Sequence, residues 1–390
     1  MGESGQRLGS QGRLAAGTMR RDTDGAIGAG RDESIAPVLS TIIFMSVLPF
    51  RVRCDCGRLA SILALGCIVL SMPCADAAAA SPFEHNPEVE TFIEQLVAGH
   101  QFDRRELRRL FRHARIQTGI LRAMSRPRTA LPWYQYRASQ LTEARIQGGV
   151  EYWQSHAATL ARVSAEYGVP QEIIVATIGL ETFYGRNTGT SKVFDALATL
   201  AFAYPPRAEL FRGELEQFLL LARESNFDPT RSKGSYAGAL GIAQFLPSSY
   251  RRYAVDFDGD GKRDLWNHED AIGSIANYYR SYGWKTGEPV IVAIERQPET
   301  AGDAFGQLLE RGPLPHATAA AVKQSGVTPA EPVDDNALVS VFGAESDDGM
   351  SYWMGFNNFY VITRYNRSIN YALSVYELSQ ELRRARFREE

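Results

Sequence analysis

Two arrangements of carboxylates in this 390-residue chain are suited to chemistry. The first is a single glutamate, Glu181, in IGLETFYGR (Ile178–Arg186), which follows a run of mostly apolar residues. The second is DFDGDGKRD (Asp256–Asp264), in which several aspartates lie close together. A lone carboxyl in apolar surroundings suits proton transfer, whereas clustered carboxylates suit the binding of a cation. The sequence therefore predicts two separate sites.

The residues before Glu181 predict a buried helix that starts near Pro170. Ile174, Thr177 and Ile178 lie seven, four and three positions before Glu181, so they share its helical face. This face should be apolar and largely buried. Because burial disfavours the ionised form of a carboxyl, the pattern predicts a raised pKa for Glu181.

The expected C-terminal cap of this helix is Gly185, which places Glu181 in the last turn. The helix dipole presents partial negative charge there, and this also disfavours an ionised glutamate. A raised pKa suits an acid that delivers a proton near neutral pH. The alternative is an ion pair with an arginine such as Arg186, and this segment alone does not decide between the two.

Small residues surround a glutamine in GSYAGALGIAQFLPSSY (Gly234–Tyr250). Glycine and alanine at this density permit the backbone to approach a ligand or another helix closely. The amide of Gln244 offers both a donor and an acceptor, which suits a sugar hydroxyl or an N-acetyl group. Tight helix packing is the structural alternative, and the two interpretations are compatible.

The aspartate-rich segment has the spacing of an EF-hand-like calcium loop. Position 6, the sharp turn, is Gly261, but position 12 is Asn267 in place of the usual bidentate glutamate. A carboxylate three residues further on is expected to complete the coordination. Because clustered carboxylates repel one another without a cation, we predict a structural Ca²⁺ and no organic cofactor. The expected ligands are Asp256, Asp258, Asp260, Asp264 and Asp270.

The elements that position these residues are mainly helical. Helical periodicity runs from 86 to about 282, interrupted by LPWYQYR (Leu131–Arg137), which is expected to be a loop. Short β-branched runs at 289–295, 337–342 and 351–356 predict strands, and helical periodicity returns over 358–384. The strands are therefore interpreted as a small antiparallel insertion in a helical core. The expected parts are a helical N-terminal part (78–139), the core (140–288), the inserted β domain (289–353) and a C-terminal helical part of the core (354–390).

Residues 1–77 are expected to be an unstructured prefix followed by a signal peptide. Three arginines at 51, 53 and 58 precede an apolar run, Leu59–Met72, and the sequence Ala75-Asp76-Ala77 resembles a cleavage site. Met45 is then a candidate start. A transmembrane anchor and lipidation at Cys67 are the alternatives. All four cysteines precede residue 78, so no disulfide is expected in the exported chain.

The charge balance argues against nucleic-acid binding. Residues 1–77 hold eight Lys and Arg and seven Asp and Glu, so 34 basic and 38 acidic residues remain in the exported part. Such a chain has no basic excess with which to neutralise phosphates. The arginine-rich segment FDRRELRRLFRHAR (Phe102–Arg115) suggests either a contact with an anionic polymer or a solvated helix face, and we favour the second.

Several long motifs occur in the order found in one enzyme family. They are Glu181 with Thr182 and Gly185, DALATLAF (Asp195–Phe202), FRGELEQFL (Phe211–Leu219), GALGIAQFLPSSY (Gly238–Tyr250), the calcium loop and TRYNRS (Thr363–Ser368). Together they resemble the lytic murein transglycosylases of the membrane-bound B type, which are like glycoside hydrolase family 103. The resemblance covers about residues 85–385. It implies a mainly α fold with a lysozyme-like helical core.

The resemblance also implies roles for individual residues. Glu181 matches the catalytic acid and base. The positions that match a glycan-binding groove are Ser235, Gln244, Tyr278, Tyr365, Asn366 and Tyr371, with Tyr136 as a weaker match. Arg207 matches one arginine of a pair, but the partner position is Pro206, which leaves peptide-stem contacts open.

The implied reaction is cleavage of the MurNAc–GlcNAc bond of peptidoglycan with formation of 1,6-anhydroMurNAc. Most glycosidases need two carboxylates. Here the C6 hydroxyl of the sugar replaces water, so Glu181 would act first as acid and then as base. The alternatives are a hydrolytic muramidase and a silent glycan-binding scaffold. The expected setting is the periplasm, with membrane association open, glycan strands and cell-wall enzyme complexes as partners, and a monomeric chain.

Overall fold

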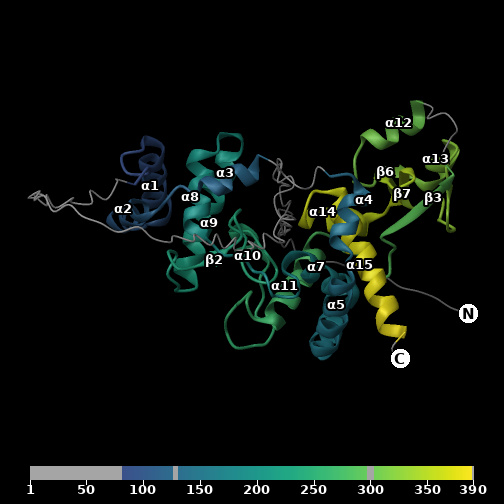
Figure 1. Ribbon diagram of the computed structural model, residues 1–390, viewed down its shortest axis with the longest axis horizontal. Helices are drawn as coiled ribbons and strands as arrows, with labels where there is room; N and C mark the ends of the chain where they lie inside the picture. Colours follow the sequence, from purple (N-terminus) through teal and green to yellow (C-terminus); the bar gives the residue numbers. More distant parts are fainter. Residues whose placement is uncertain (1–80, 126–130, 297–302, 389–390) are drawn as a thin grey trace, which may run out of the picture. The chain divides into compact units, whose positions relative to one another are not determined.

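The computed structural model describes residues 81–125, 131–296 and 303–388, and all of them belong to one compact unit (Figure 1). The expected prefix, signal peptide and anchor, together with the four cysteines, lie outside the described residues. Within the described ranges, no helix combines the length and the apolar character needed to cross a membrane.

The first elements of the described part are three short helices. They are α1 (Pro87–His100), α2 (Arg104–His113) and α3 (Thr118–Met124). The side chain of Asn86 accepts the amide of Glu88 at the start of α1, and Asp103 caps α2 in the same way. Each helix buries one apolar face in the main core, as the periodicity predicts.

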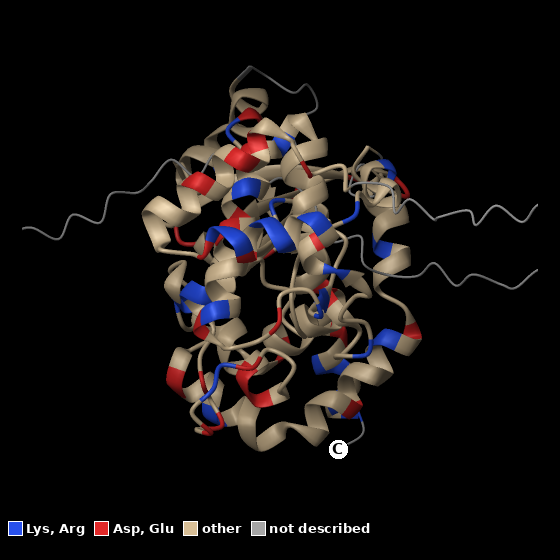
Figure 2. Cartoon of the chain, turned by 90° about the vertical axis from the view of Figure 1, so that its left-hand side faces the viewer, with Lys and Arg blue, Asp and Glu red and all other residues tan. Residues whose placement is uncertain are grey.

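The arginines of α2 include ion-pair partners of acidic residues on α1. Arg108 Nη2 lies 2.8 Å from Glu90 Oε2, and Arg104 pairs with Glu94. Basic and acidic residues are also interspersed on the helices seen in Figure 2. Exposed pairs of this kind contribute little to stability, about 0–1 kcal/mol. The arrangement fits a solvated helix face better than a surface dedicated to an anionic polymer.

The segment expected to be a loop at 131–137 is largely helical, and that prediction is wrong. Helix α4 (Trp133–Gln140) starts after Pro132, which serves as its N-cap residue. Trp133, Tyr136 and Gln140 are buried on one side of it, because they are three and four residues apart. The aromatic residues that were expected to lie in a loop therefore contribute to the buried face of a short helix.

The central part of the chain consists of seven helices. Its members are α5 (Glu143–Ser155), α6 (Ala157–Tyr167), α7 (Gln171–Thr182), α8 (Val193–Ala203), α9 (Ala208–Glu224), α10 (Pro247–Tyr253) and α11 (His268–Ser281). A 3₁₀ turn, Pro205–Arg207, precedes α9, and two short strands, β1 (Ser191–Lys192) and β2 (Lys233–Gly234), pair antiparallel. Helix α7 contacts α5, α6, α11 and α15. It is apolar on all sides, as expected of a helix in the middle of a core.

A five-stranded sheet interrupts the helical sequence. Its strand order is β4-β6-β7-β3-β5, and all of the pairings are antiparallel. The strands are β3 (Ile291–Arg296), β4 (Ala317–Thr318), β5 (Thr328–Pro329), β6 (Leu338–Ser346) and β7 (Gly349–Gly355). Two helices between the strands, α12 (Asp303–Glu310) and α13 (Ala319–Gln324), were not predicted. They help the sheet to form a second, smaller apolar cluster that includes Phe305, Val322, Val341 and Met354.

The chain then returns to the helical core. Helix α14 (Asn357–Tyr365) and helix α15 (Ile369–Arg388) follow β7, and α15 packs along both α7 and α5. The sequence predicted continuous helical character here, but the helix breaks at Asn366, whose backbone is extended. This break places Tyr365, Asn366 and Tyr371 next to residues of the core.

Candidate active site

Glu181 lies at the end of the most buried helix of the chain. Every residue from Ile173 to Thr182 is buried, and Glu181 itself is 1% exposed. The predicted cap at Gly185 is wrong, because the helix already ends at Phe183, which adopts a left-handed conformation with φ 51°. The placement of Glu181 in the last turn is nevertheless correct.

The carboxyl of Glu181 has a single hydrogen-bond partner in the described part of the chain. Tyr371 Oη donates to Oε1 at 2.7 Å, whereas Oε2 is buried with no partner there. Burial raises the pKa of Glu181 to about 8, and the Tyr371 hydrogen bond opposes this only in part. The alternative ion pair with Arg186 does not form, since Arg186 lies 3.7 Å from Glu151 instead. Burial therefore favours the neutral form of the Glu181 carboxyl.

A layer of buried tyrosines surrounds this carboxyl. Tyr365 Oη donates to the carbonyl of Ala243 at 2.5 Å, and Tyr278 Oη donates to that of Arg364 at 2.6 Å. The rings of Tyr365 and Tyr371 are stacked with centroids 6.4 Å apart. Burial raises the pKa of all three phenols, so they are neutral donors.

Tyr279 belongs to the same layer and was missed by the sequence reasoning. Its hydroxyl shares a 2.8 Å hydrogen bond with Thr177 Oγ1, one turn before Glu181 on α7. The signal was available, because Thr177 is on the face of Glu181 and is a buried hydroxyl that needs a partner. Tyr279 thus ties α11 to the face of α7 that carries Glu181.

Gln244 sits in a tight loop that is attached to α7. It has a left-handed φ of 50°, and its Nε2 donates to the carbonyls of Thr188 and Gly241 at 3.1 and 2.7 Å. Thr182 Oγ1 donates to the carbonyl of Ile242 at 3.1 Å, which joins this loop to the end of α7. The acceptor Oε1 of Gln244 is buried and has no partner among the described residues.

Asn366 carries a second buried side-chain amide without a hydrogen-bond partner among the described residues. It is 4% exposed, and neither its Oδ1 nor its Nδ2 has a hydrogen-bond partner in the ranges described. Buried polar atoms are normally satisfied, so the atoms without a partner among the described residues at Glu181, Gln244 and Asn366 are candidates for hydrogen bonds to a polar ligand. The hydrogen bond from Tyr365 to Ala243 connects the neighbours of both amides.

Three other residues from the resemblance have different surroundings. Ser235 Oγ accepts the amides of Ala237 and Ala239, so it shapes the turn before Gln244. Tyr136 is buried on α4. Arg207 is partly buried above the ring of Phe211, and its pKa is lowered by burial and by the nearby Arg367. The described contacts do not join these three directly to Glu181.

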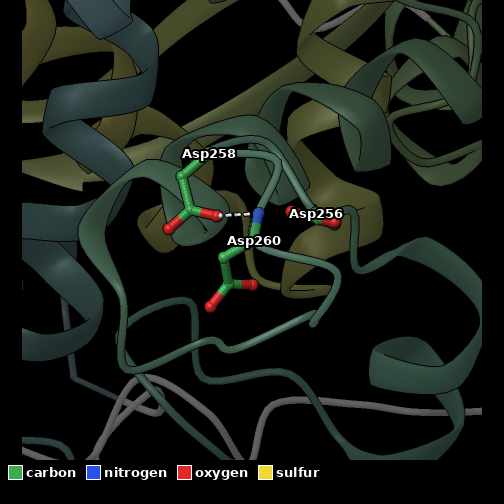
Figure 3. Close-up of side chains that lie close together, drawn as sticks. All are labelled: Asp256, Asp258 and Asp260. Atoms are coloured by element: carbon green, nitrogen blue, oxygen red, sulfur yellow. Dashed lines mark hydrogen bonds between the residues drawn. The ribbon is translucent and has the colours of Figure 1, made fainter.

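The aspartate-rich loop brings three carboxylates together (Figure 3). Asp256, Asp258 and Asp260 each offer an oxygen within 4.8 Å of the others, and all three are exposed. The loop is shaped by backbone amides, since Asp256 accepts from Gly259 and Gly261. Both glycines have φ above 80°, as sharp turns require. Oxygen donors at this spacing fit a hard cation such as Ca²⁺.

The other two predicted ligands, Asp264 and Asp270, lie outside that cluster. The buried carboxylate of Asp270 accepts the amides of Phe257, Asp258 and Asp264, so it fastens both ends of the loop to α11. Asp264 accepts the amide of Trp266. Both oxygens of Asp270 and one oxygen of Asp264 accept backbone amides, which gives these residues a part in shaping the loop, and their role as calcium ligands stays a prediction.

A mainly helical core with a buried carboxyl of raised pKa is the arrangement expected of an enzyme that cleaves glycans. Residues 84–380 match the transglycosylase SLT domain. The chain belongs to this family, and its activity is that of a lytic murein transglycosylase, a lyase that acts on peptidoglycan.

Individual relatives support this assignment over most of the chain. The membrane-bound lytic murein transglycosylase B of Escherichia coli K12 is 42% identical over 314 residues, which are 78% of this chain and 85% of the relative. The structure of SltB1 from Pseudomonas aeruginosa has a TM-score of 0.73 at 47% identity, covering 78% of this chain and 99% of that one. The E. coli transglycosylase Slt35, solved with calcium, has a TM-score of 0.72 at 41% identity, covering 79% and 96%.

Proposed function

We propose that Glu181 carries out the transglycosylase reaction alone, cleaving the MurNAc–GlcNAc bond with formation of 1,6-anhydroMurNAc. The observation that carries this proposal is the carboxyl of Glu181, which is buried, has its pKa raised to about 8 by burial, and is hydrogen-bonded to described residues at only one of its two oxygens. Tyr371 occupies Oε1, so the proton to be transferred belongs on Oε2.

In the first half of the reaction, Glu181 donates this proton to the glycosidic oxygen as the bond from that oxygen to C1 breaks. In the second half, the C6 hydroxyl of the same sugar attacks C1 and its proton returns to Glu181. The carboxyl ends the cycle as it began, and no water is consumed. Tyr371 stabilises the carboxylate that exists between the two steps.

The absence of a second carboxylate agrees with this route. In the described ranges, the buried acidic residues other than Glu181 are Glu214 and Asp270. Glu214 accepts the amide and hydroxyl of Ser248, and Asp270 accepts backbone amides of the calcium loop. Neither is available to activate a water, which a hydrolytic muramidase would need.

The amides of Gln244 and Asn366 are proposed to hold the substrate. Gln244 Oε1 can accept from a sugar hydroxyl or N-acetyl N–H, and Asn366 has both a donor and an acceptor to offer. Tyr278, Tyr365 and Tyr371 would add aromatic surface near the sugars. Ser235, Tyr136 and Arg207 are proposed to act further along the glycan.

We propose that Ca²⁺ binds at Asp256, Asp258 and Asp260 and has a structural role. The donor set fits, and the relative Slt35 was solved in complex with calcium. The ion would neutralise the three carboxylates and stabilise the loop that leads into α11, the helix that carries Tyr278 and Tyr279.

We also propose that the protein is exported to the periplasm and acts there as a monomer on glycan strands. The signal-peptide pattern at 51–77 supports export, and the E. coli relative is described as membrane-bound. Cell-wall enzyme complexes are the protein partners that such a location would offer.

Mass spectrometry of digested murein sacculi tests the reaction. The expected products are anhydro-muropeptides, and the Glu181→Gln variant should form them at least about 1,000-fold more slowly while still binding murein. Glu172→Gln, at a partly buried position in the first turn of the same helix, is the matched control and should keep full activity. Reducing muropeptides would instead identify a muramidase, and no products at all would identify a binding scaffold.

A further inference from the structure

Arg145 is among the largest side chains that are fully buried in this protein. It lies on α5 and is 1% exposed, and none of the ion pairs between described residues involves it. An arginine is almost never buried without a carboxylate, because removing its charge from water is costly. Burial lowers its pKa for the same reason. Such a group needs an explanation that the overall fold does not provide.

The Nε and Nη1 groups of Arg145 donate to backbone carbonyls of the described residues. Its Nε donates to Gly179 at 3.2 Å, and its Nη1 donates to Ser139 at 3.4 Å and to Gln140. Gly179 is two residues before Glu181, and its carbonyl also accepts the amide of Phe183 at 3.1 Å. A positive charge at this end of α7 opposes the negative pole of the helix dipole.

The main chain of α7 turns sharply just after Glu181. Phe183 and Tyr184 both have left-handed backbones, with φ 51° and 63°. Each costs roughly 1–2 kcal/mol for a residue with a Cβ, so two in succession persist only when the surroundings hold them. The backbone here is therefore under strain.

Arg145 contacts both of the strained residues. Its guanidinium carbon lies 5.4 Å from the centroid of the Phe183 ring, and its own carbonyl accepts a 2.7 Å hydrogen bond from Tyr184 Oη. The Tyr184 side chain is clamped between α5 and α7. A Cβ at Gly149 would approach its hydroxyl to 2.4 Å, and a Cβ at Gly179 would approach it to 2.6 Å.

We infer that Arg145 is a positioning residue for Glu181, because it fixes the backbone on both sides of the catalytic residue. Gly179 precedes Glu181 by two positions and Phe183 follows it by two, and Arg145 holds both. The carboxyl is thereby kept pointing toward Tyr371 and the proposed substrate amides. This inference rests on the proposed role of Glu181.

The Arg145→Met variant separates positioning from stability. Methionine fills much of the buried volume but has neither charge nor donors, and the charge it removes was costly to bury. On soluble, peptide-free glycan strands we expect kcat to fall about 100-fold with KM within about twofold, as for a misplaced catalytic group. Arg145→Lys keeps the charge and some donors, so its kcat should be about tenfold higher than that of Arg145→Met.

The control is Thr199→Val in α8, a buried residue whose hydroxyl also bonds to backbone. It should lower the melting temperature and leave kcat unchanged. A wild-type kcat in folded Arg145→Met, a loss confined to KM, or equal kcat values for the Lys and Met variants would overturn the inference.

If Arg145→Met does not fold, Tyr184→Phe tests the same contact by removing one hydroxyl. A drop in kcat of about tenfold at constant KM supports the inference, and an unchanged kcat overturns it. Full activity of Glu181→Gln would be a different result, since it would remove the proposed role of Glu181 itself.

Discussion

The end of α7 and the aspartate loop use the same functional group in opposite ways. Glu181 is buried, receives one hydrogen bond from a hydroxyl and has no charged partner within the described residues. Asp256, Asp258 and Asp260 are exposed and lie within reach of one another. The first arrangement favours a carboxyl that keeps its proton, and the second favours carboxylates that share a cation.

The surroundings of a carboxylate thus determine whether it is suited to proton transfer or to cation binding. Around Glu181 the apolar residues of α7 and the tyrosines of α11, α14 and α15 exclude water. Around the aspartates the backbone amides and glycine turns hold the side chains in an open loop. The two regions are connected along the chain, because the loop leads into α11, which carries Tyr278 and Tyr279.

The larger of two stability effects concerns Glu181. Below a pH of about 4.5 the glutamate is protonated in both the folded and the unfolded chain. Between that pH and about 8 only the unfolded chain loses the proton, so the folded state becomes less stable as the pH rises. Glu181→Gln removes this cost. The free energy of unfolding of the variant should therefore exceed that of the parent by an amount that grows to about 3 kcal/mol at pH 7.

Denaturant unfolding at several pH values measures this difference, with Glu172→Gln as the control. The control should show no comparable growth with pH. If the difference in free energy of unfolding between Glu181→Gln and the parent is the same at pH 4 and pH 7, Glu181 is not held in its neutral form. The contrast between Glu181 and the aspartate loop would then be wrong.

The smaller effect concerns the aspartate loop. Calcium at 100 times its Kd should stabilise the protein by about 2.7 kcal/mol, measured as a higher melting temperature than in chelator. Asp260→Ala should lose this increment and should differ from the parent only when calcium is present. Asp228→Ala removes an aspartate from a turn outside the cluster, so it should keep the increment. Identical melting curves of the parent protein in calcium and in chelator would refute the metal site.

Much of the fold could be predicted from periodicity alone. The buried helix before Glu181 and the two longest strands follow from local spacing of apolar residues. Helix α4 was missed because its aromatic residues directly follow Pro132 and are informative only once their buried positions are known. Helices α12 and α13 were missed for a similar reason, because they are stabilised by packing against the sheet, which local sequence does not reveal.

The site could be predicted only in part, for a related reason. Glu181 and the first three aspartates stand out by type and spacing. The left-handed turn at Phe183 and Tyr184 could not be predicted, because no local preference favours it in these residues and Arg145 holds it from another helix. Asp270 has ligand chemistry in the sequence, and only the structure shows that backbone amides occupy it.

The central claim, that Glu181 is a protonated acid at neutral pH, can be measured directly. Carbon-13 NMR of the protein labelled at its glutamate carboxyl carbons, with the Glu181 signal identified by its loss in Glu181→Gln, gives the titration of this one group. We predict a midpoint near pH 8, because burial raises its pKa. A midpoint near the ordinary glutamate value of about 4.3 would contradict this account.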